Sequence, residues 1–79
     1  MARDRVVYHV VPTASGEHWL ISQEHDETFR EYHRTKEEAV EAAKARARGQ
    51  EPSQVKVHKS DGNMEYESTY GADPRRSPS

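Results

Sequence analysis

Short runs of β-branched and aromatic residues predict two strands in the first third of the chain. The first run covers residues 5–12 and ends at Pro12. Residues 18–25 then alternate, with Trp19 and Ile21 on one face. Such side chains are enriched in strands, and alternation indicates a sheet with two different faces. The loop between the runs contains Gly16 and is too short for a crossover, so we expect the two strands to pair antiparallel.

A capping box predicts the start of one helix. The hydroxyl of Thr35 can accept a hydrogen bond from the amide of Glu38, whose carboxylate can reach back. The apolar stripe that follows at helical spacing comprises Ala39, Val40, Ala43 and Ala47. Gly49 and then Pro52 end the helix. Because the stripe is mostly alanine, we expect the helix to approach its sheet closely.

The dipeptide Asp61-Gly62 predicts a second hairpin, formed by residues 54–60 and 63–70. With these two residues at the centre of the turn, Ser60 faces Asn63. The pairs that follow are Val57 with Tyr66, Val55 with Ser68, Lys56 with Glu67 and His58 with Glu65. The first two pairs share one face and the last two share the other, so apolar and charged partners separate in a single register.

These elements predict an α+β fold of two layers, in the order β-β-(β)-α-β-β. An antiparallel sheet of two hairpins carries one helix on one face. The strand in parentheses is residues 28–32, which are compatible with a short strand. The expected core is Tyr8, Val10, Trp19, Ile21, Phe29, Val40, Val55, Val57 and Tyr66, with the helical alanines. Residues 1–70 form the expected domain, and residues 71–79 are expected to be a loosely ordered tail.

The same alternation predicts an apolar patch on the face opposite the helix. If Tyr8 and Val10 face the helix, then Val7 and Val11 lie on the open face, together with Leu20. An apolar patch on an uncovered sheet face is often a contact surface. These three residues are the candidate interaction face.

Composition changes this picture mainly by exclusion. The chain has 79 residues, 32% hydrophobic and 33% charged, with a net charge of −2, which fits one domain with a thin core. The absence of cysteine excludes a disulfide scaffold, a thiolate metal site and a thiol nucleophile. No apolar run is long enough to span a membrane or to form a signal peptide, so we expect a cytoplasmic protein with no membrane partner.

Candidate catalytic and metal-binding chemistry is sparse. The five histidines have none of the short spacings that commonly present two metal ligands, so neither a metal nor another cofactor is expected. Strand histidines are interpreted as surface groups paired with carboxylates such as Glu65. No serine lies in a Gly-x-Ser-x-Gly motif, and a short chain has difficulty forming a pocket of the usual ~300–1,000 Å³. We therefore expect neither enzyme activity nor a small-molecule substrate.

Basic residues around the helix offer an alternative function. The candidate nucleic-acid patch is Arg34, Lys44, Arg46, Arg48, Arg75 and Arg76. If the tail folds back toward the end of the helix, this end of the molecule is positive and could contact phosphates. Interleaved glutamates weigh against this interpretation, and the helix dipole by itself accounts for late helical cations.

Several segments in order resemble the bacterial family called domain of unknown function 2188. They are residues 8–12 (Tyr-His-Val-Val-Pro), Trp19, residues 35–43, Val57-His58 ahead of the Asp61-Gly62 turn, and residues 69–74. The resemblance spans roughly residues 6–74. It implies a compact, stand-alone bacterial domain without an assigned activity, and it supplies no catalytic residues.

The function expected from the sequence is therefore that of a small, non-enzymatic interaction or accessory module. It would associate with an unknown protein partner, or with itself, through the open sheet face or a sheet edge. The alternative is a nucleic-acid-binding accessory protein that uses the basic helix end and the tail.

Overall fold

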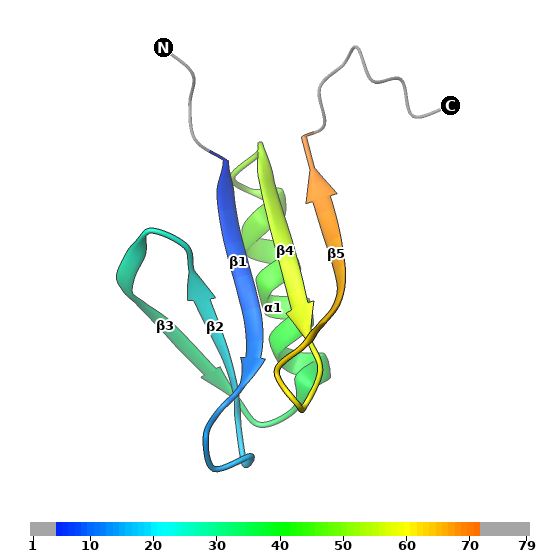
Figure 1. Cartoon of the computed structure of the whole chain (residues 1–79). Coiled ribbons are helices and arrows are strands. Elements are labelled where there is room, and N and C mark those ends of the chain that lie inside the picture. Colours follow the sequence, from blue (N-terminus) through cyan, green and yellow to red (C-terminus); the bar gives the residue numbers. More distant parts are fainter. Residues whose placement is uncertain (1–4, 72–79) are drawn as a thin grey trace.

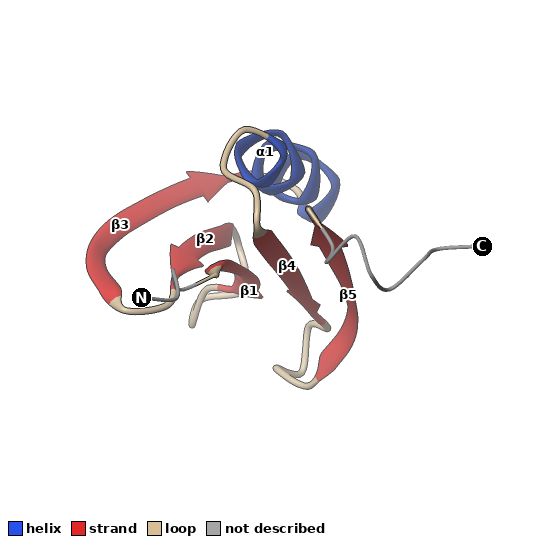
Figure 2. Cartoon of the chain, turned by 90° about the horizontal axis from the view of Figure 1, so that it is seen from above, coloured by secondary structure: helices blue, strands red, loops and turns tan. Residues whose placement is uncertain are grey.

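Five strands and one helix make up residues 5–71, which are the part of the chain that the computed structural model describes. The elements are β1 (Val6–Pro12), β2 (Trp19–Gln23), β3 (Asp26–His33), α1 (Lys36–Arg48), β4 (Ser53–His58) and β5 (Met64–Tyr70). The strands form one sheet in the order β3-β2-β1-β4-β5 (Figure 1). The helix lies against one face of this curved sheet (Figure 2). The predicted α+β class, with one helix on one face, is confirmed.

The predicted antiparallel arrangement is wrong at the centre of the sheet, which is mixed. β1 and β4 run parallel, from the pair Val6–Ser53 to the pair Val10–Val57, whereas the other three strand pairs are antiparallel. The cause is β3, which has eight residues and pairs with β2. As a third strand, β3 runs in the same direction as β1. The helix α1 then carries the chain back to the end of the sheet at which β1 begins. β4 must therefore begin beside the start of β1 and run in the same direction.

The second hairpin confirms most of the predicted register. Val57 pairs with Tyr66, and the pairs Val55–Ser68 and Lys56–Glu67 are also formed. His58 pairs with Met64 and not with Glu65, because the register shifts by one residue between Val57 and His58. Glu65 is the extra residue of this bulge.

A loop one residue longer than predicted causes the shift. The amide of Gly62 donates to the carbonyl oxygen of Lys59 at 2.9 Å, and the amide of Lys59 donates to Asn63 at 2.7 Å. Residues 60–62 thus form a three-residue loop, with Gly62 at φ 94°, as is common when a type I turn precedes a left-handed glycine. The bulge at Glu65 compensates for the longer loop, which is why the remaining predicted pairs survive.

The core lies between α1 and the sheet. Its buried members are Tyr8, Val10, Ile21, Ala39, Val40, Ala43, Ala47, Val55 and Val57. Trp19 and Phe29, also predicted in the core, are partly buried and pack against it. Tyr66 was wrongly placed there, since it is 41% exposed. It belongs to edge strand β5, whereas α1 packs chiefly over β1 and β4.

The predicted helix boundaries are confirmed. The Thr35 hydroxyl accepts a hydrogen bond from the amide of Glu38 at 3.1 Å, and α1 ends at Arg48 with Gly49 as its C-cap. No helix within residues 5–71 is long and apolar enough to cross a membrane. Apart from Gly71, the predicted tail of residues 71–79 lies outside the described residues.

Candidate functional site

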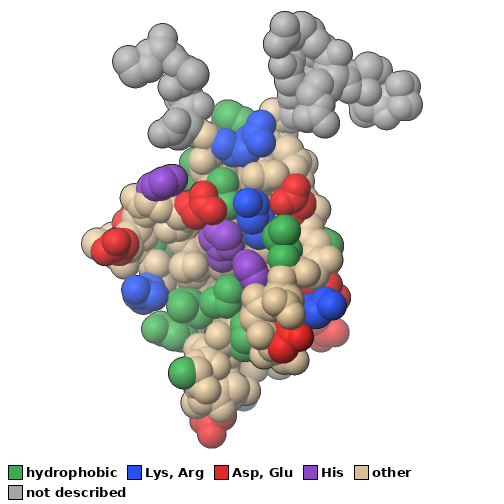
Figure 3. All heavy atoms as spheres, viewed as in Figure 1, with side chains coloured by type: hydrophobic (Ala, Val, Ile, Leu, Met, Phe, Trp, Pro, Cys, Tyr) green, Lys and Arg blue, Asp and Glu red, His purple; other side chains and the backbone are tan. Residues whose placement is uncertain are grey.

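A row of apolar side chains crosses the sheet face opposite α1. The register pairs Val11 of β1 with Leu20 of β2, and Leu20 with Tyr32 of β3. Side chains of such partners are neighbours on the same face, and Val11 points away from the helix because the adjacent Val10 is in the core. We call these three residues the apolar row. Figure 3 views this face and shows hydrophobic side chains gathered over the part of the sheet nearest β1 and β2.

The apolar row shares Val11 and Leu20 with the predicted interaction face, but it contains Tyr32 in place of Val7. Val11 and Leu20 are half-buried, as expected for a surface patch, but Val7 is only 8% exposed and offers little surface to a partner. Tyr32, which is 57% exposed, was missed because its place beside Leu20 depends on the pairing of β3 with β2. The signal available in the sequence was an aromatic residue in a segment compatible with a strand.

Two histidines from the central parallel strands meet on the same open face. Nδ1 of His9 on β1 lies 3.1 Å from Nε2 of His58 on β4, and the two rings are tilted by 35°. Each ring has a second partner: Nε2 of His9 lies 2.9 Å from Oε2 of Glu24, and Nδ1 of His58 lies 3.1 Å from the carbonyl oxygen of Gly62. We call these four groups the histidine chain.

The acidic end of the histidine chain is ionised at neutral pH. The hydrogen bond from His9 lowers the pKa of Glu24 below its usual value, against a smaller opposing effect of burial. The positive charge of Lys56, on the neighbouring strand β4, acts in the same direction. A carboxylate can only accept hydrogen bonds, so Nε2 of His9 is the donor in this contact.

Sequence spacing did not predict this meeting of histidines, because His9 and His58 are 49 positions apart and only the parallel pairing of β1 with β4 brings them together. The predicted pairing of strand histidines with carboxylates holds for His9 and Glu24. The carboxylate named for that role, Glu65, instead forms an ion pair with Lys36 of α1. Residues 5–71 contain no group of three or more side chains arranged to hold a metal ion.

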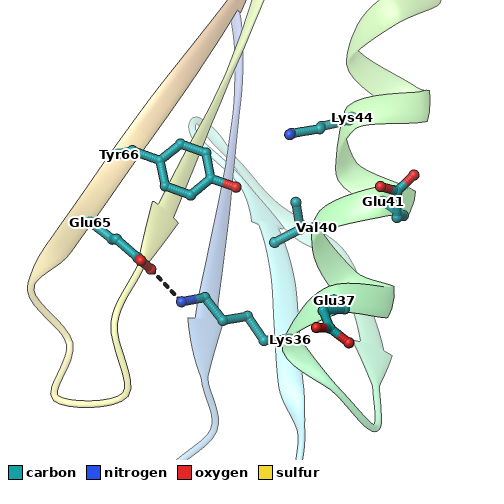
Figure 4. A pocket seen from close by; sticks show the side chains of 7 residues that line it. All are labelled: Lys36, Glu37, Val40, Glu41, Lys44, Glu65 and Tyr66. Carbon is teal, nitrogen blue, oxygen red and sulfur yellow. Dashed lines mark hydrogen bonds and ion pairs between the residues drawn. The ribbon is translucent and has the colours of Figure 1, made fainter.

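A groove of about 400 Å³ lies on the other side of the sheet, between α1 and β5. Its volume falls in the range of ligand pockets, ~300–1,000 Å³, which the chain length did not predict. Figure 4 shows Glu65 and Tyr66 pointing from β5 toward the helix. Glu65 is paired with Lys36, and Nζ of Lys44 lies 5.7 Å from the centre of the Tyr66 ring. Lys36, Glu65 and Lys44 of this groove are thus already engaged with one another or with an aromatic face.

The described members of the candidate nucleic-acid patch do not form one surface. Lys44 and Arg48 extend toward β5, and the Arg48 guanidinium lies 5.9 Å from the centre of the Tyr70 ring. Arg46 extends toward β3, where it forms an ion pair with Glu31 at 2.5 Å. Arg34 precedes the helix and lies about 20 Å from its far end, at about 1.5 Å per residue. The other two, Arg75 and Arg76, lie outside the described residues.

Comparison with known proteins supplies a family but no activity. A model of the family described as "Uncharacterized protein conserved in bacteria (DUF2188)" matches residues 8–70. No curated protein and no solved structure matches the chain significantly. The matched residues cover most of the chain, including both histidines and the whole apolar row. The chain therefore belongs to the DUF2188 family, and the resemblance drawn from its sequence is confirmed.

Proposed function

We propose that this DUF2188 protein is a small cytoplasmic binding module without enzyme activity, whose open sheet face associates with a second copy of the chain. The observation that supports the proposal is the apolar row. It crosses three adjacent strands, and no element among residues 5–71 covers it. Apolar groups gathered on an uncovered sheet face favour association, because burying them removes their surface from water.

Charge on the open face supports a second copy as the partner. In a symmetric dimer the same patch meets itself, so an interface of one charge sign would repel its own image. Here both signs flank the apolar row: Arg30 pairs across the sheet with Ser22, and Lys56 pairs with Glu67. Such a face can place its cations against the anions of its partner. The core has nine buried side chains among residues 5–71, and so thin a core also gains stability from further apolar burial on association.

Sedimentation velocity over a wide range of protein concentrations tests this proposal. We expect the sedimentation coefficient to rise with concentration, and Leu20→Glu to hold the protein as a monomer, because a charge at the centre of the apolar row cannot be buried unpaired. Ala45→Glu is the matched control. It adds the same charge at an exposed position of α1, on the opposite side of the molecule, and is expected to leave association unchanged.

A chain that stays monomeric at millimolar concentration would overturn the proposal, as would equal association of the Leu20→Glu variant and the unmodified protein. Circular dichroism of both variants verifies that they are folded. A titration with mixed-sequence DNA at low salt tests the alternative function, since phosphate contacts weaken steeply with added salt. Lys44 and Arg46 extend to different sides of α1, and Arg34 lies before its first residue. This dispersal favours no binding in that experiment.

A further inference from the structure

The two ends of the histidine chain determine which ring nitrogens carry hydrogen. The Glu24 carboxylate and the Gly62 carbonyl oxygen can only accept hydrogen bonds. Nε2 of His9 and Nδ1 of His58 are therefore the donors. Since a neutral imidazole has a single N–H, the other nitrogen of each ring carries a lone pair. Those nitrogens, Nδ1 of His9 and Nε2 of His58, are the two that face each other across 3.1 Å.

Two lone pairs that face each other repel unless a positive charge lies between them. We propose that His9 and His58 form a binding site for a divalent transition-metal ion with a preference for imidazole, such as Zn²⁺, Ni²⁺ or Cu²⁺. Such an ion requires two deprotonated nitrogens close to one another, and the neutral tautomers of this pair present them 3.1 Å apart.

The separation of the two nitrogens fits two ligands of one ion. Metal–nitrogen bonds to histidine are about 2.0–2.1 Å long, which places two ligands about 2.9 Å apart at a right angle and about 3.4 Å apart at a tetrahedral angle. The 3.1 Å observed between Nδ1 of His9 and Nε2 of His58 lies between these values. Binding therefore needs a change of only a few tenths of an ångström in the separation of the two nitrogens, together with a turn of the rings toward the ion.

The surroundings of the rings also match those of metal-binding histidines. Such a histidine generally donates its remaining N–H to a carboxylate or a backbone carbonyl, which fixes the ring and increases its basicity. His9 has the first kind of partner and His58 the second. The His9 side chain is 22% exposed, so water can complete the coordination. The chain also contains no cysteine that would compete for the ion.

This inference is independent of the proposed self-association, because both ligands come from one chain. A proton is the competing occupant of the space between the rings. One proton shared there gives an N–H···N hydrogen bond of ordinary length at 3.1 Å. A titration with metal ions distinguishes the two occupants, because a site that only shares a proton binds no metal.

Calorimetric titration of the chelator-treated protein with Zn²⁺, and with Cu²⁺ in parallel, tests the proposal. We expect one ion per chain, and a Cu²⁺ electron paramagnetic resonance spectrum with two nitrogen donors. His9→Gln and His58→Gln each remove one ligand and are expected to abolish specific binding. Glu24→Ala is expected to weaken binding about 10-fold, because it removes only the group that orients His9. The matched controls His18→Gln and His33→Gln are expected to bind normally.

NMR of the unmodified protein provides a measurement that does not depend on the folding of a variant. Addition of Zn²⁺ is expected to move the ring resonances of His9 and His58, and to leave those of His18, His25 and His33 in place. Absence of bound ion at millimolar Zn²⁺ and Cu²⁺ would show that a proton alone occupies the space, and would overturn the proposal. Undiminished binding in both His9→Gln and His58→Gln would do the same.

Discussion

The hydroxyl of Ser53 donates a hydrogen bond of 2.6 Å to the carbonyl oxygen of Ala47 in the interior of the protein. Both residues are fully buried. The last carbonyl groups of a helix have no partner within it. The carbonyl of Ala47 accepts this bond from the first residue of β4 and a second bond, of 3.0 Å, from the amide of Gln50. The end of α1 is thereby fixed to the centre of the sheet.

Removal of this hydroxyl is expected to destabilise the protein. Ser53→Ala leaves this buried carbonyl with the amide of Gln50 as its remaining partner, so we expect the free energy of unfolding to fall by about 1 kcal/mol, the net contribution of one hydrogen bond. Urea unfolding followed by circular dichroism measures the loss. Ser60→Ala, in the exposed turn between β4 and β5, is the control and should change the stability by less than about 0.5 kcal/mol. Equal effects of the two substitutions would contradict the assigned role of Ser53.

Two adjacent valines on β1 allow a direct test of which face of the sheet carries the core. Val10 is fully buried under α1, whereas Val11 is half-buried on the open face. Val10→Ala should lower the free energy of unfolding by about 2 kcal/mol or more, from lost burial and the cavity left behind. Val11→Ala should cost less than half as much in the monomer. Thermal unfolding at low protein concentration compares the stability of the two variants. A larger loss in Val11→Ala than in Val10→Ala would contradict the placement of the core between α1 and the sheet.

Two glycines with positive φ are expected to differ in their tolerance of alanine. At Gly62 (φ +94°) an added Cβ meets nothing within 4 Å, whereas at Gly71 (φ +73°) it would lie 2.7 Å from Cβ of Glu51. Gly62→Ala should cost about 1–2 kcal/mol, from the left-handed backbone alone. Gly71→Ala should cost more, because strain and overlap add. Urea unfolding measures both losses. A smaller loss of stability for Gly71→Ala than for Gly62→Ala would show that Glu51 moves aside without cost.

The dependence of stability on pH should report the charge of Glu31. Partial burial by itself would raise the pKa of Glu31, but hydrogen bonds from His33 and Arg46 outweigh it and hold the pKa below the ordinary value of 4.5. Because the pKa is lower in the folded than in the unfolded chain, the ionised group stabilises the fold above about pH 4.5. This contribution is lost as the pH falls through the folded-state value.

Glu31→Gln should therefore lower the free energy of unfolding at pH 7, by about 1 kcal/mol for a partly exposed charged hydrogen-bonding group. The difference from the unmodified protein should shrink as the pH falls below about 4.5. Glu17→Gln, in the exposed loop before β2, serves as the control. A difference between Glu31→Gln and the unmodified protein that stays constant from pH 7 to pH 3 would exclude charge as its source.

Local patterns in the sequence predicted the elements and most of their faces. The Thr35 cap, the alanine stripe of α1 and the apolar pairs of the second hairpin each depend on residues close in sequence, and each is found in the structure. Of the predicted capping box, the structure shows the bond from the Glu38 amide to the Thr35 hydroxyl. The bulge at Glu65 was not predictable in this way. The turn has one residue more than predicted, and the bulge takes up one extra residue of β5. The two shifts in register cancel, so the pairs beyond the bulge are the same as those predicted without either feature.

The candidate site could be predicted only in part, because it depends on how distant strands are ordered. Val11 and Leu20 were found from alternation along two neighbouring strands. Tyr32 needed the pairing of β3 with β2, and the contact of His9 with His58 needed the parallel pairing of β1 with β4. Short sequence spacings carry no information on such a contact. Because β3 is a strand, β4 runs parallel to β1, and this direction brings His58 beside His9. The contact could therefore be predicted only with β3 assigned as a strand.

The central position of β1 has a consequence for the newly made chain. This strand leaves the ribosome first among the described elements, yet one of its two neighbours is β4, so residues 13–52 must be made before residues 53–57 can pair with it. At about 5–20 residues per second, that interval lasts roughly two to eight seconds. Until then the backbone groups of β1 that later pair with β4 form an open edge in a valine-rich strand, and this edge can add a strand from another chain. Protection from aggregation during synthesis therefore depends on the prompt arrival of β4.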